Sequence, residues 1–255
     1  AWTQETYANP SSGHPAGRSA SALVERARTQ VATLAGRRDR DVIFTSGASE
    51  SATLALLGIG LAARESAERD FIVNATEHKA ILAAAELAAS ISGGGVRVVR
   101  VTTEGVVDFE DLDRAIQETS ACAVVTMLAN NETGVINPIQ SVRDRVPDSA
   151  LLVVDLTQAA GKIPIEETPY DIGFFSSHKM YGPKGAGALI ADRQTRRRLT
   201  PVFPGGGQEH GLRGGTQPAP ALAAFGLAAE LAAQELAADA AHSQALVAEF
   251  LAGFR

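Results

Sequence analysis

The segment Asp41-Val-Ile-Phe-Thr-Ser-Gly-Ala-Ser-Glu50 indicates the fold class. Its first five residues predict a short buried strand, residues 46–49 a turn, and the apolar residues that follow predict a helix to about Ala63. The same alternation of strand and helix recurs along the chain as far as Ala191. It predicts an α/β fold in which a mostly parallel sheet is sandwiched by helices.

Hydrophobic periodicity and turn residues predict the positions of the other helices and strands on either side of this unit. Helices are predicted over about 19–35, 78–91, 109–118 and 139–146, and strands over 71–74, 96–101, 122–128, 151–154, 172–175 and 186–191. From about Pro220 to Phe254 the sequence is rich in Ala, Leu and Glu, and it predicts one long helix with Gly226 as an early break. We therefore divide the chain into a large domain (1–217) and a long linker helix (218–255) toward a small domain that the chain lacks.

The composition and net charge of the chain limit the classes of molecule that it is expected to bind. The chain has 255 residues, of which 45% are hydrophobic and 20% charged, with a formal net charge of −6. This acidic balance favours neither a nucleic acid nor an anionic membrane as partner. There is neither a signal-peptide pattern nor a run of 18 apolar residues, so no membrane span is predicted.

The single cysteine, Cys122, excludes an intrachain disulfide and fits a reducing cytoplasm. It opens a predicted core strand and is interpreted as a small buried hydrophobe. His14, His210 and His242 have no metal-ligand spacing with each other or with an acid, so we predict no metal site.

A phosphate-site candidate lies in the turn at 46–49. Small residues such as Ala48 let the backbone approach an anion, the helix N-terminus offers N–H groups, and Ser49 adds a hydroxyl. The alternative is an ordinary strand–helix loop with a serine N-cap. The segment lacks the GxxxxGK[ST] pattern, which disfavours a nucleoside triphosphate.

Lys179 is the candidate amine nucleophile. The chain has only four lysines, at positions 79, 162, 179 and 184. Lys179 follows Ser176-Ser-His178 after a predicted strand and precedes the glycine-rich Tyr181-Gly-Pro-Lys-Gly-Ala-Gly187. A lysine amine forms a Schiff base only when neutral, so it requires burial or neighbouring cations. The alternative is a surface lysine in a loop.

Polar residues also follow three other predicted strands, at the edge where α/β sheets place ligands. Asp155 could keep a ring nitrogen protonated, as a pyridine electron sink requires, and Gln158 could reach the same ligand. His78 could stack on an aromatic cofactor or move protons, and an amide of the Asn130-Asn131 pair could bind a ring hydroxyl. Each could instead be a turn or helix-start residue.

Taken in order, these segments resemble the cysteine desulfurases of the class V, fold-type I pyridoxal-phosphate enzymes. The matching stretches are Asn9-Pro-Ser-Ser12, Phe44-Thr-Ser-Gly-Ala-Ser-Glu-Ser51, Thr76-Glu-His-Lys-Ala80, Asn130-Asn-Glu-Thr-Gly134, Asp155-Leu-Thr-Gln158, Ser176-Ser-His-Lys-Met-Tyr-Gly-Pro-Lys-Gly185 and Gly205-Gly-Gly-Gln-Glu-His-Gly-Leu-Arg-Gly-Gly-Thr216. They cover nearly the whole chain, and the ordered set is far more specific than any one of them.

The resemblance implies a role for each candidate. Lys179 would carry pyridoxal 5'-phosphate covalently and move the substrate Cα proton, and His78 would stack on the ring. The other cofactor-binding residues would be Asp155 at the ring nitrogen, Gln158 and Asn131 near the ring hydroxyl, and Ala48, Ser49, Ser176 and His178 at the phosphate. Thr216 would reach the phosphate of the neighbouring subunit's cofactor, which implies a homodimer.

The resemblance also implies a substrate, L-cysteine, and a sulfur-acceptor or scaffold protein, in iron–sulfur assembly, tRNA thiolation or DNA sulfur modification. The family's persulfide cysteine and an arginine for the substrate carboxylate lie beyond the position of Arg255. Cys122 matches neither the place nor the setting of that cysteine. Three alternatives remain open: a selenocysteine lyase or another class V aminotransferase or epimerase; a non-catalytic domain that binds cofactor or dimerises; and a nucleotide-binding Rossmann module, which the missing G-x-G-x-x-G disfavours.

Overall fold

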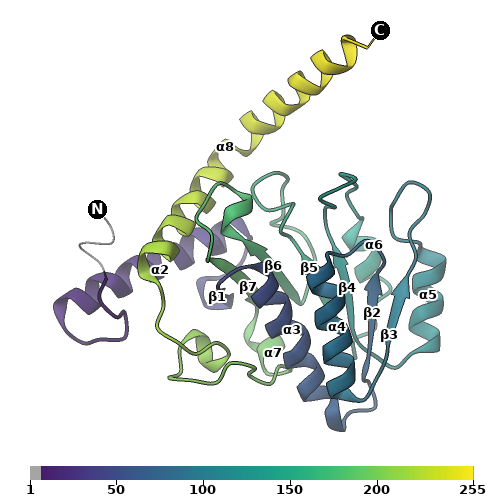
Figure 1. Cartoon of the computed structure of the whole chain (residues 1–255), viewed down its shortest axis with the longest axis horizontal. Coiled ribbons are helices and arrows are strands. Elements are labelled where there is room, and N and C mark those ends of the chain that lie inside the picture. The colour runs from purple at the N-terminus through teal and green to yellow at the C-terminus, as the bar shows by residue number, and fades with distance from the viewer. Residues whose placement is uncertain (1–6, 255) are drawn as a thin grey trace.

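The computed structural model describes residues 7–254, and a seven-stranded sheet lies at its centre (Figure 1). The strand order is β1-β7-β6-β5-β4-β2-β3. The strands are β1 (Val42–Thr45), β2 (Asp70–Asn74), β3 (Val96–Val99), β4 (Ala121–Met127), β5 (Leu151–Asp155), β6 (Ile172–Ser176) and β7 (Gly187–Ala191).

The prediction of a mostly parallel sheet is confirmed, because β3, β2, β4, β5 and β6 pair in parallel. β7 runs antiparallel to both of its neighbours, β6 and β1. The sequence did not predict this reversal. Its cause is the short connection over residues 177–186, which leaves no room for the helical crossover that a parallel pair needs.

Helices cover both faces of the sheet. The helices are α2 (Pro15–Leu34), α3 (Ala48–Ala62), α4 (Lys79–Ser92), α5 (Phe109–Glu118), α6 (Ile139–Arg143), α7 (Arg193–Arg196) and α8 (Ala219–Ala252), with single 3-10 turns η1 (Asp39–Asp41), η2 (Ala63–Glu65), η3 (Ser177–Lys179) and η4 (Glu209–Gly211). Along β5, Leu151 and Val153 pack with α3 and α4, whereas Leu152 and Val154 pack with α2, α5 and α8. The alternating side chains of one strand therefore supply two cores.

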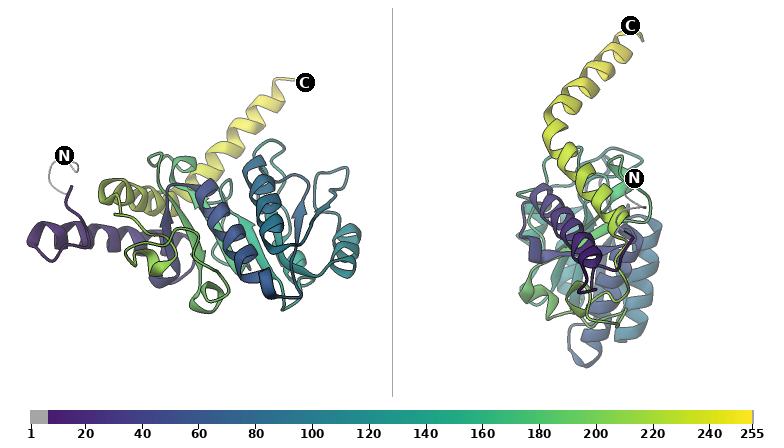
Figure 2. Two further views of the ribbon diagram at one scale, coloured as in Figure 1. Left: turned by 60° about the horizontal axis from the view of Figure 1, so that its bottom comes forward. Right: turned by 90° about the vertical axis from the view of Figure 1, so that its left-hand side faces the viewer.

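The first half of α8 belongs to the core. The ring of Phe225 packs edge-on against Phe44 at 6.2 Å and Phe175 at 6.0 Å between ring centroids. Gly226, predicted as a break, lies within the continuous helix. A Cβ there would lie 2.5 Å from the Cα of Ala27, so glycine allows α8 to approach α2 closely. The buried residues of α8 end at Ala229, and its second half projects from the body (Figure 2).

Length and composition alone would allow α8 to cross a membrane. Its most apolar 18-residue window has a mean hydropathy of 1.3, and 22% of that window is buried. The sequence predicted no span from this segment. One such helix is weak evidence for a membrane, because core helices meet the same criteria, and the first half of α8 packs on α2.

Several predicted boundaries were wrong for local reasons. α2 begins at Pro15 instead of residue 19, because the Nδ1 of His14 caps it by accepting the Gly17 N–H at 3.1 Å. β3 stops at Val99 because the Arg100 N–H leaves the sheet and donates to Asp111. The predicted helix over 139–146 shortens to α6, which ends at Arg143.

Candidate cofactor site

A cavity of about 250 Å³ lies at the carboxyl ends of β4, β5 and β6. Nine of the ten predicted site residues line it: Ala48, Ser49, His78, Asn131, Asp155, Gln158, Ser176, His178 and Lys179. They come from separate loops and strand ends that the parallel sheet brings to one edge. The tenth, Thr216, is exposed and lies outside this cavity.

Asp155, the last residue of β5, is the buried acid of the cavity. Its side chain accepts the Thr157 N–H at 2.7 Å through Oδ1. Burial raises the pKa of Asp155, while the hydrogen bonds from Thr157 and the nearby imidazole of His78 oppose that rise. Oδ1 of Asp155 thus accepts a protein hydrogen bond, and a cationic ligand in the cavity would stabilise the buried carboxylate.

His78 stands beside this acid at the N-cap of α4. Its Nδ1 accepts the Ala80 N–H at 3.2 Å, which orients the ring and leaves Nε2 as the protonated nitrogen of the neutral form. The imidazole is exposed and faces the cavity. It can therefore stack on a planar ligand or exchange a proton with it.

The turn between β1 and α3 forms the anion-binding end of the cavity. Gly47 is the N-cap of α3 with no side-chain cap, so Ser49 lies inside the first turn and the alternative of a serine N-cap is wrong. The Ala48 N–H donates to Ser176 Oγ at 2.7 Å, which leaves the Ser176 hydroxyl hydrogen available to an anion. Gly187 allows this approach, because a Cβ there would lie 2.6 Å from the Cα of Gly47.

Lys179 and His178 lie in the turn η3, directly after β6. Both side chains are exposed and line the cavity. Partial burial and then the charges of Lys179 and Lys184 lower the pKa of His178, so its imidazole is a neutral donor at pH 7. The structure thus places the exposed candidate nucleophile in the same cavity as the buried Asp155.

Gln158 has a partner that sequence reasoning missed. Its Oε1 accepts a hydrogen bond from the Lys162 ammonium four residues later, within the turns that follow β5, which leaves its NH₂ group as the donor toward the cavity. Burial and then the charge of Lys179 lower the pKa of Lys162, so two of the four lysines lie close together. Both residues lie in turns outside any helix, so no helical spacing in the sequence could have indicated this contact.

The two adjacent asparagines of the 130–134 turn have different roles. Asn130 is buried, and its amide donates to the Thr76 carbonyl at 3.1 Å while its Oδ1 accepts the Glu132 and Thr133 N–H groups. Asn131 is exposed and reaches the cavity. Asn130 therefore holds the turn and leaves Asn131 to contact a ligand.

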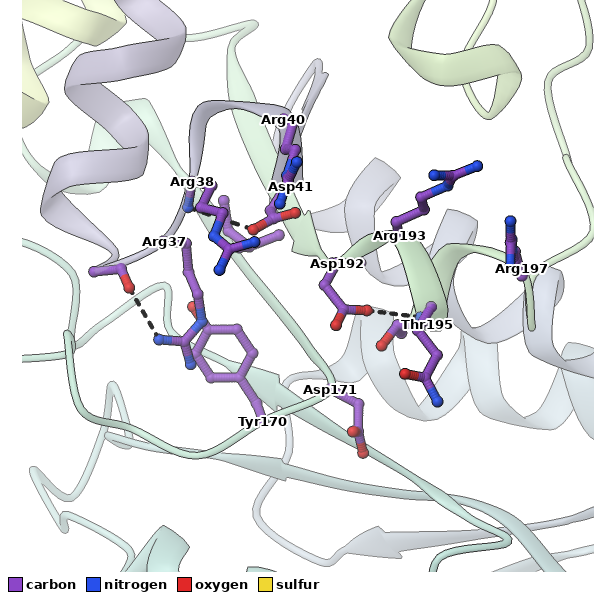
Figure 3. Close-up of a pocket in the computed structure, with 14 residues that line it drawn as sticks. Arg37, Arg38, Arg40, Asp41, Tyr170, Asp171, Asp192, Arg193, Thr195 and Arg197 are labelled. Atoms are coloured by element: carbon purple, nitrogen blue, oxygen red, sulfur yellow. Dashed lines mark hydrogen bonds between the residues drawn. The ribbon is translucent and has the colours of Figure 1, made fainter.

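A larger cavity of about 880 Å³ lies near the opposite edge of the sheet (Figure 3). Arginines and acids line it, among them Arg37, stacked over Tyr170 at 4.4 Å, and Asp171, which precedes β6. None of the predicted site residues and none of the four lysines lines it. It therefore does not compete as the site of a lysine-bound cofactor.

The only cysteine is buried at the start of β4. The Cys122 thiol donates to the Asp70 carbonyl at 3.3 Å, and burial raises its pKa to about 12. Because the thiolate is the reactive form, we expect native Cys122 to react with iodoacetamide about a thousandfold more slowly than an exposed cysteine. Mass spectrometry with and without urea checks this, and rapid labelling of the native chain would contradict it.

The glycine-rich loop that carries Thr216 is anchored by a buried ion pair. Glu209 accepts hydrogen bonds from Arg28 at 2.9 and 3.0 Å and from the Phe44 N–H at 2.9 Å. It adopts a left-handed φ of 47°, which a side chain rarely takes without such restraint. The pair ties the loop to α2 and β1.

Replacing Arg28 with Met leaves a buried carboxylate unpaired. We expect Arg28→Met to lower the free energy of unfolding by about 3–5 kcal/mol in urea melts. Arg26→Met, on the exposed face of the same helix, should change it by about 0.5 kcal/mol or less. Equal losses in the two variants would refute the anchoring role.

Comparisons with known proteins identify the family of the chain. The aminotransferase class-V family matches residues 2–255. A cysteine desulfurase of Frankia sp. (strain EuIK1) is 45% identical over 254 residues, which cover 96% of this chain and 60% of the relative. The chain thus spans less than two thirds of that relative's length.

Two solved structures extend the likeness to three dimensions. A NifS-like protein superposes with a TM-score of 0.91 at 36% identity, covering 99% of this chain and 69% of its own. SspA in complex with cysteine has a TM-score of 0.82 at 32% identity, covering 90% and 66%. The chain therefore belongs to the class-V aminotransferase family, as a relative of its cysteine desulfurases.

Proposed function

We propose that this chain is the pyridoxal-phosphate-binding part of a cysteine desulfurase. The observation that carries the proposal is the cavity at the carboxyl edge of the sheet, with a buried Asp155 and a rim lysine, Lys179. Class-V aminotransferases and cysteine desulfurases are families that depend on pyridoxal phosphate. The relatives support the family's cofactor, and the arrangement of the side chains supports its use here.

The side chains fit the cofactor at both ends. Asp155 is a nearly enclosed carboxylate, and a buried anion is stabilised by a cation such as a protonated ring nitrogen. At the other end, the first turn of α3 and the hydroxyls of Ser49 and Ser176 supply donors for a phosphate. His178, a neutral imidazole at pH 7, would add a further donor at that end.

When bound, pyridoxal phosphate supplies an electron sink for negative charge at the substrate Cα. Lys179 would hold the cofactor and then move the Cα proton as a general base. Asp155 would keep the ring nitrogen protonated, His78 would hold the ring plane, and the amide groups of Gln158 and Asn131 would orient the ring hydroxyl. The protein thus contributes orientation and electrostatics.

The relatives named cysteine desulfurase and the SspA structure with cysteine support L-cysteine as the substrate. Desulfuration passes the substrate sulfur to a thiolate and leaves alanine. Cys122 cannot be that thiolate, because it is buried and protonated. We infer that the accepting thiol lies outside these 255 residues, and that the sulfur then passes to an acceptor or scaffold protein.

We further propose a cytoplasmic homodimer. Thr216 is exposed and lies outside the cavity of its own chain, which supports a contact with the cofactor site of a second copy. The start of α8 at Ala219 supports a division near residue 217, although the first half of that helix packs in the core. The lone, protonated cysteine supports a reducing compartment.

Titration of the purified chain with pyridoxal phosphate tests the function. We expect one equivalent per chain to bind and a visible absorption band to appear that dialysis does not remove. Pyridoxine 5'-phosphate, which lacks the aldehyde, is the matched control and should bind without the band. A chain that takes up no pyridoxal phosphate would refute the proposal.

A further inference from the structure

Glu77 is a buried carboxyl group next to the cofactor site that does not line it. The side chain is fully enclosed, and its Oε1 accepts the Met127 N–H at 2.5 Å. Its other oxygen, Oε2, has no hydrogen-bond partner among residues 7–254. A buried polar atom without a partner is costly, so it points to a role beyond packing.

The position of Glu77 links two parts of the site. Glu77 directly precedes His78, the N-cap of α4, and Met127 is the last residue of β4. Met127 pairs in register with Asp155 at the end of β5. One hydrogen bond therefore joins the loop that carries the ring-stacking histidine to the strand pair that carries the buried acid.

Glu77 and Asp155 are coupled, and their surroundings differ. Asp155 accepts the Thr157 N–H and lies near His78, whereas Glu77 has one backbone donor from β4 and no ion-pair partner among residues 7–254. Burial, and then the negative charge of Asp155, raise the pKa of Glu77 well above its usual range. Two neighbouring carboxyl groups in one buried site do not both ionise, so Asp155 takes the charge and Glu77 keeps its proton.

We propose that Glu77 is a positioning residue of the cofactor site, a neutral carboxylic acid that anchors His78 to the end of β4 and leaves Asp155 as the single anion toward the ring. This inference rests on the proposed function for the identity of the ligand. The protonation state and the anchoring are properties of the chain alone. The carbonyl oxygen of a neutral acid satisfies the Met127 N–H without adding a second buried charge.

Glutamine imitates the inferred state of Glu77, and alanine removes it. Glu77→Gln keeps an acceptor for the Met127 N–H and is neutral at every pH. Glu77→Ala leaves that N–H buried and unsatisfied. A positioning role predicts that glutamine preserves cofactor binding and alanine does not, whereas a functional carboxylate predicts that both variants fail.

The first test follows urea unfolding of the cofactor-free chain against pH. A carboxyl group with a raised folded pKa contributes stability that is complete below the unfolded value of 4.5 and is lost as pH rises toward the folded value. Between pH 4.5 and the folded pKa of Glu77, the folding constant of Glu77→Gln relative to wild type should therefore rise about tenfold per pH unit. A pH-independent difference would show that Glu77 is ionised and would overturn the proposal.

Glu50 provides the matched control for the direction in which stability changes with pH. It is half-buried and paired with Arg213 at 2.8 Å, and hydrogen bonds from Arg213 and Ser46 hold its pKa below the usual value against the opposing effect of burial. Glu50→Gln should therefore lose stability relative to wild type as pH rises through the Glu50 range. The stability of Glu77→Gln relative to wild type should rise with pH, and that of Glu50→Gln should fall.

The second test measures the pyridoxal-phosphate Kd and the pH titration of the visible band where every variant is folded by circular dichroism. Glu77→Gln should stay within about threefold of the wild-type Kd, and Glu77→Ala should weaken binding by about tenfold or more and shift the band. An unchanged Kd and band in the folded alanine variant would overturn the positioning role. Failure of the wild type itself to bind would count against the proposed function instead.

Discussion

Lys179→Ala is expected to abolish retention of pyridoxal phosphate by the chain through dialysis. Lys179 is the lysine that lines the cavity, together with Asp155. Without its amine the cofactor can bind only through the ring and phosphate contacts, so the absorption band of the covalent adduct should disappear. In a protein that also carries the accepting thiol, loss of this general base should lower kcat by about 100- to 10,000-fold.

The control for this variant is Lys184→Ala. Lys184 lies in the same glycine-rich segment, is exposed and does not line the cavity. It should retain the band and bind the cofactor as the wild type does. A wild-type band in Lys179→Ala, or loss of the band in Lys184→Ala, would show that another lysine holds the cofactor.

Asp155→Asn is expected to weaken pyridoxal-phosphate binding about tenfold to a hundredfold. Asparagine keeps an acceptor for the Thr157 N–H and removes only the negative charge, so the lost term is the charged hydrogen bond to the ring nitrogen, about 1.5–3 kcal/mol. The band of the bound cofactor should also change its pH dependence. Binding by fluorescence titration checks the affinity.

The same substitution should stabilise the cofactor-free chain. Because the pKa of Asp155 is raised by burial, its contribution to stability is complete below the unfolded value of 3.8 and is lost as pH rises toward the folded value. Asparagine does not ionise, so Asp155→Asn should have a larger free energy of unfolding in urea than wild type at neutral pH. The difference should vanish in acid.

Asp192→Asn is the matched control. Asp192 accepts the Thr195 N–H at 2.7 Å, as Asp155 accepts that of Thr157, but it is exposed at the N-cap of α7 and the hydrogen bond lowers its pKa. Its contribution is present above the unfolded pKa and lost as pH falls. The variant should lose stability at neutral pH and keep cofactor affinity, and equal behaviour of the two variants would contradict the account.

Local signals in the sequence were enough for the order and type of the elements. The helix over 109–118 was predicted with the bounds it has, because Asp108 caps it and its apolar residues are strongly periodic. The reversal of β7 was missed, since antiparallel and parallel strands have the same local pattern when both faces are buried. The direction of β7 follows from the short connection over residues 177–186 and not from the residues of the strand itself.

The site was predictable where chemistry coincides with a strand end. Asp155, His78 and Lys179 are polar residues directly after apolar runs, and the sheet brings them to one cavity. Met127 and Phe174 line the same cavity without being predicted, because an apolar residue at a strand end resembles the core. Their contact with a ligand depends on the fold.

Long-range partnerships were beyond the sequence. The ion pair of Arg28 with Glu209 joins residues 181 positions apart, and neither side chain differs locally from a surface charge. Glu77 was likewise read only as the neighbour of His78, although it is fully buried and bound to Met127. A residue's charge in the folded state depends on what covers it, and that is decided by packing.

Borohydride reduction of the chain with pyridoxal phosphate, followed by peptide mapping, would identify the lysine that holds the cofactor. Reduction converts a Schiff base on a lysine into a stable adduct that marks the residue holding the cofactor. We expect one pyridoxyl group per chain, on the peptide that contains Lys179. A label on Lys79, Lys162 or Lys184 in place of Lys179, or no label at all, would contradict it.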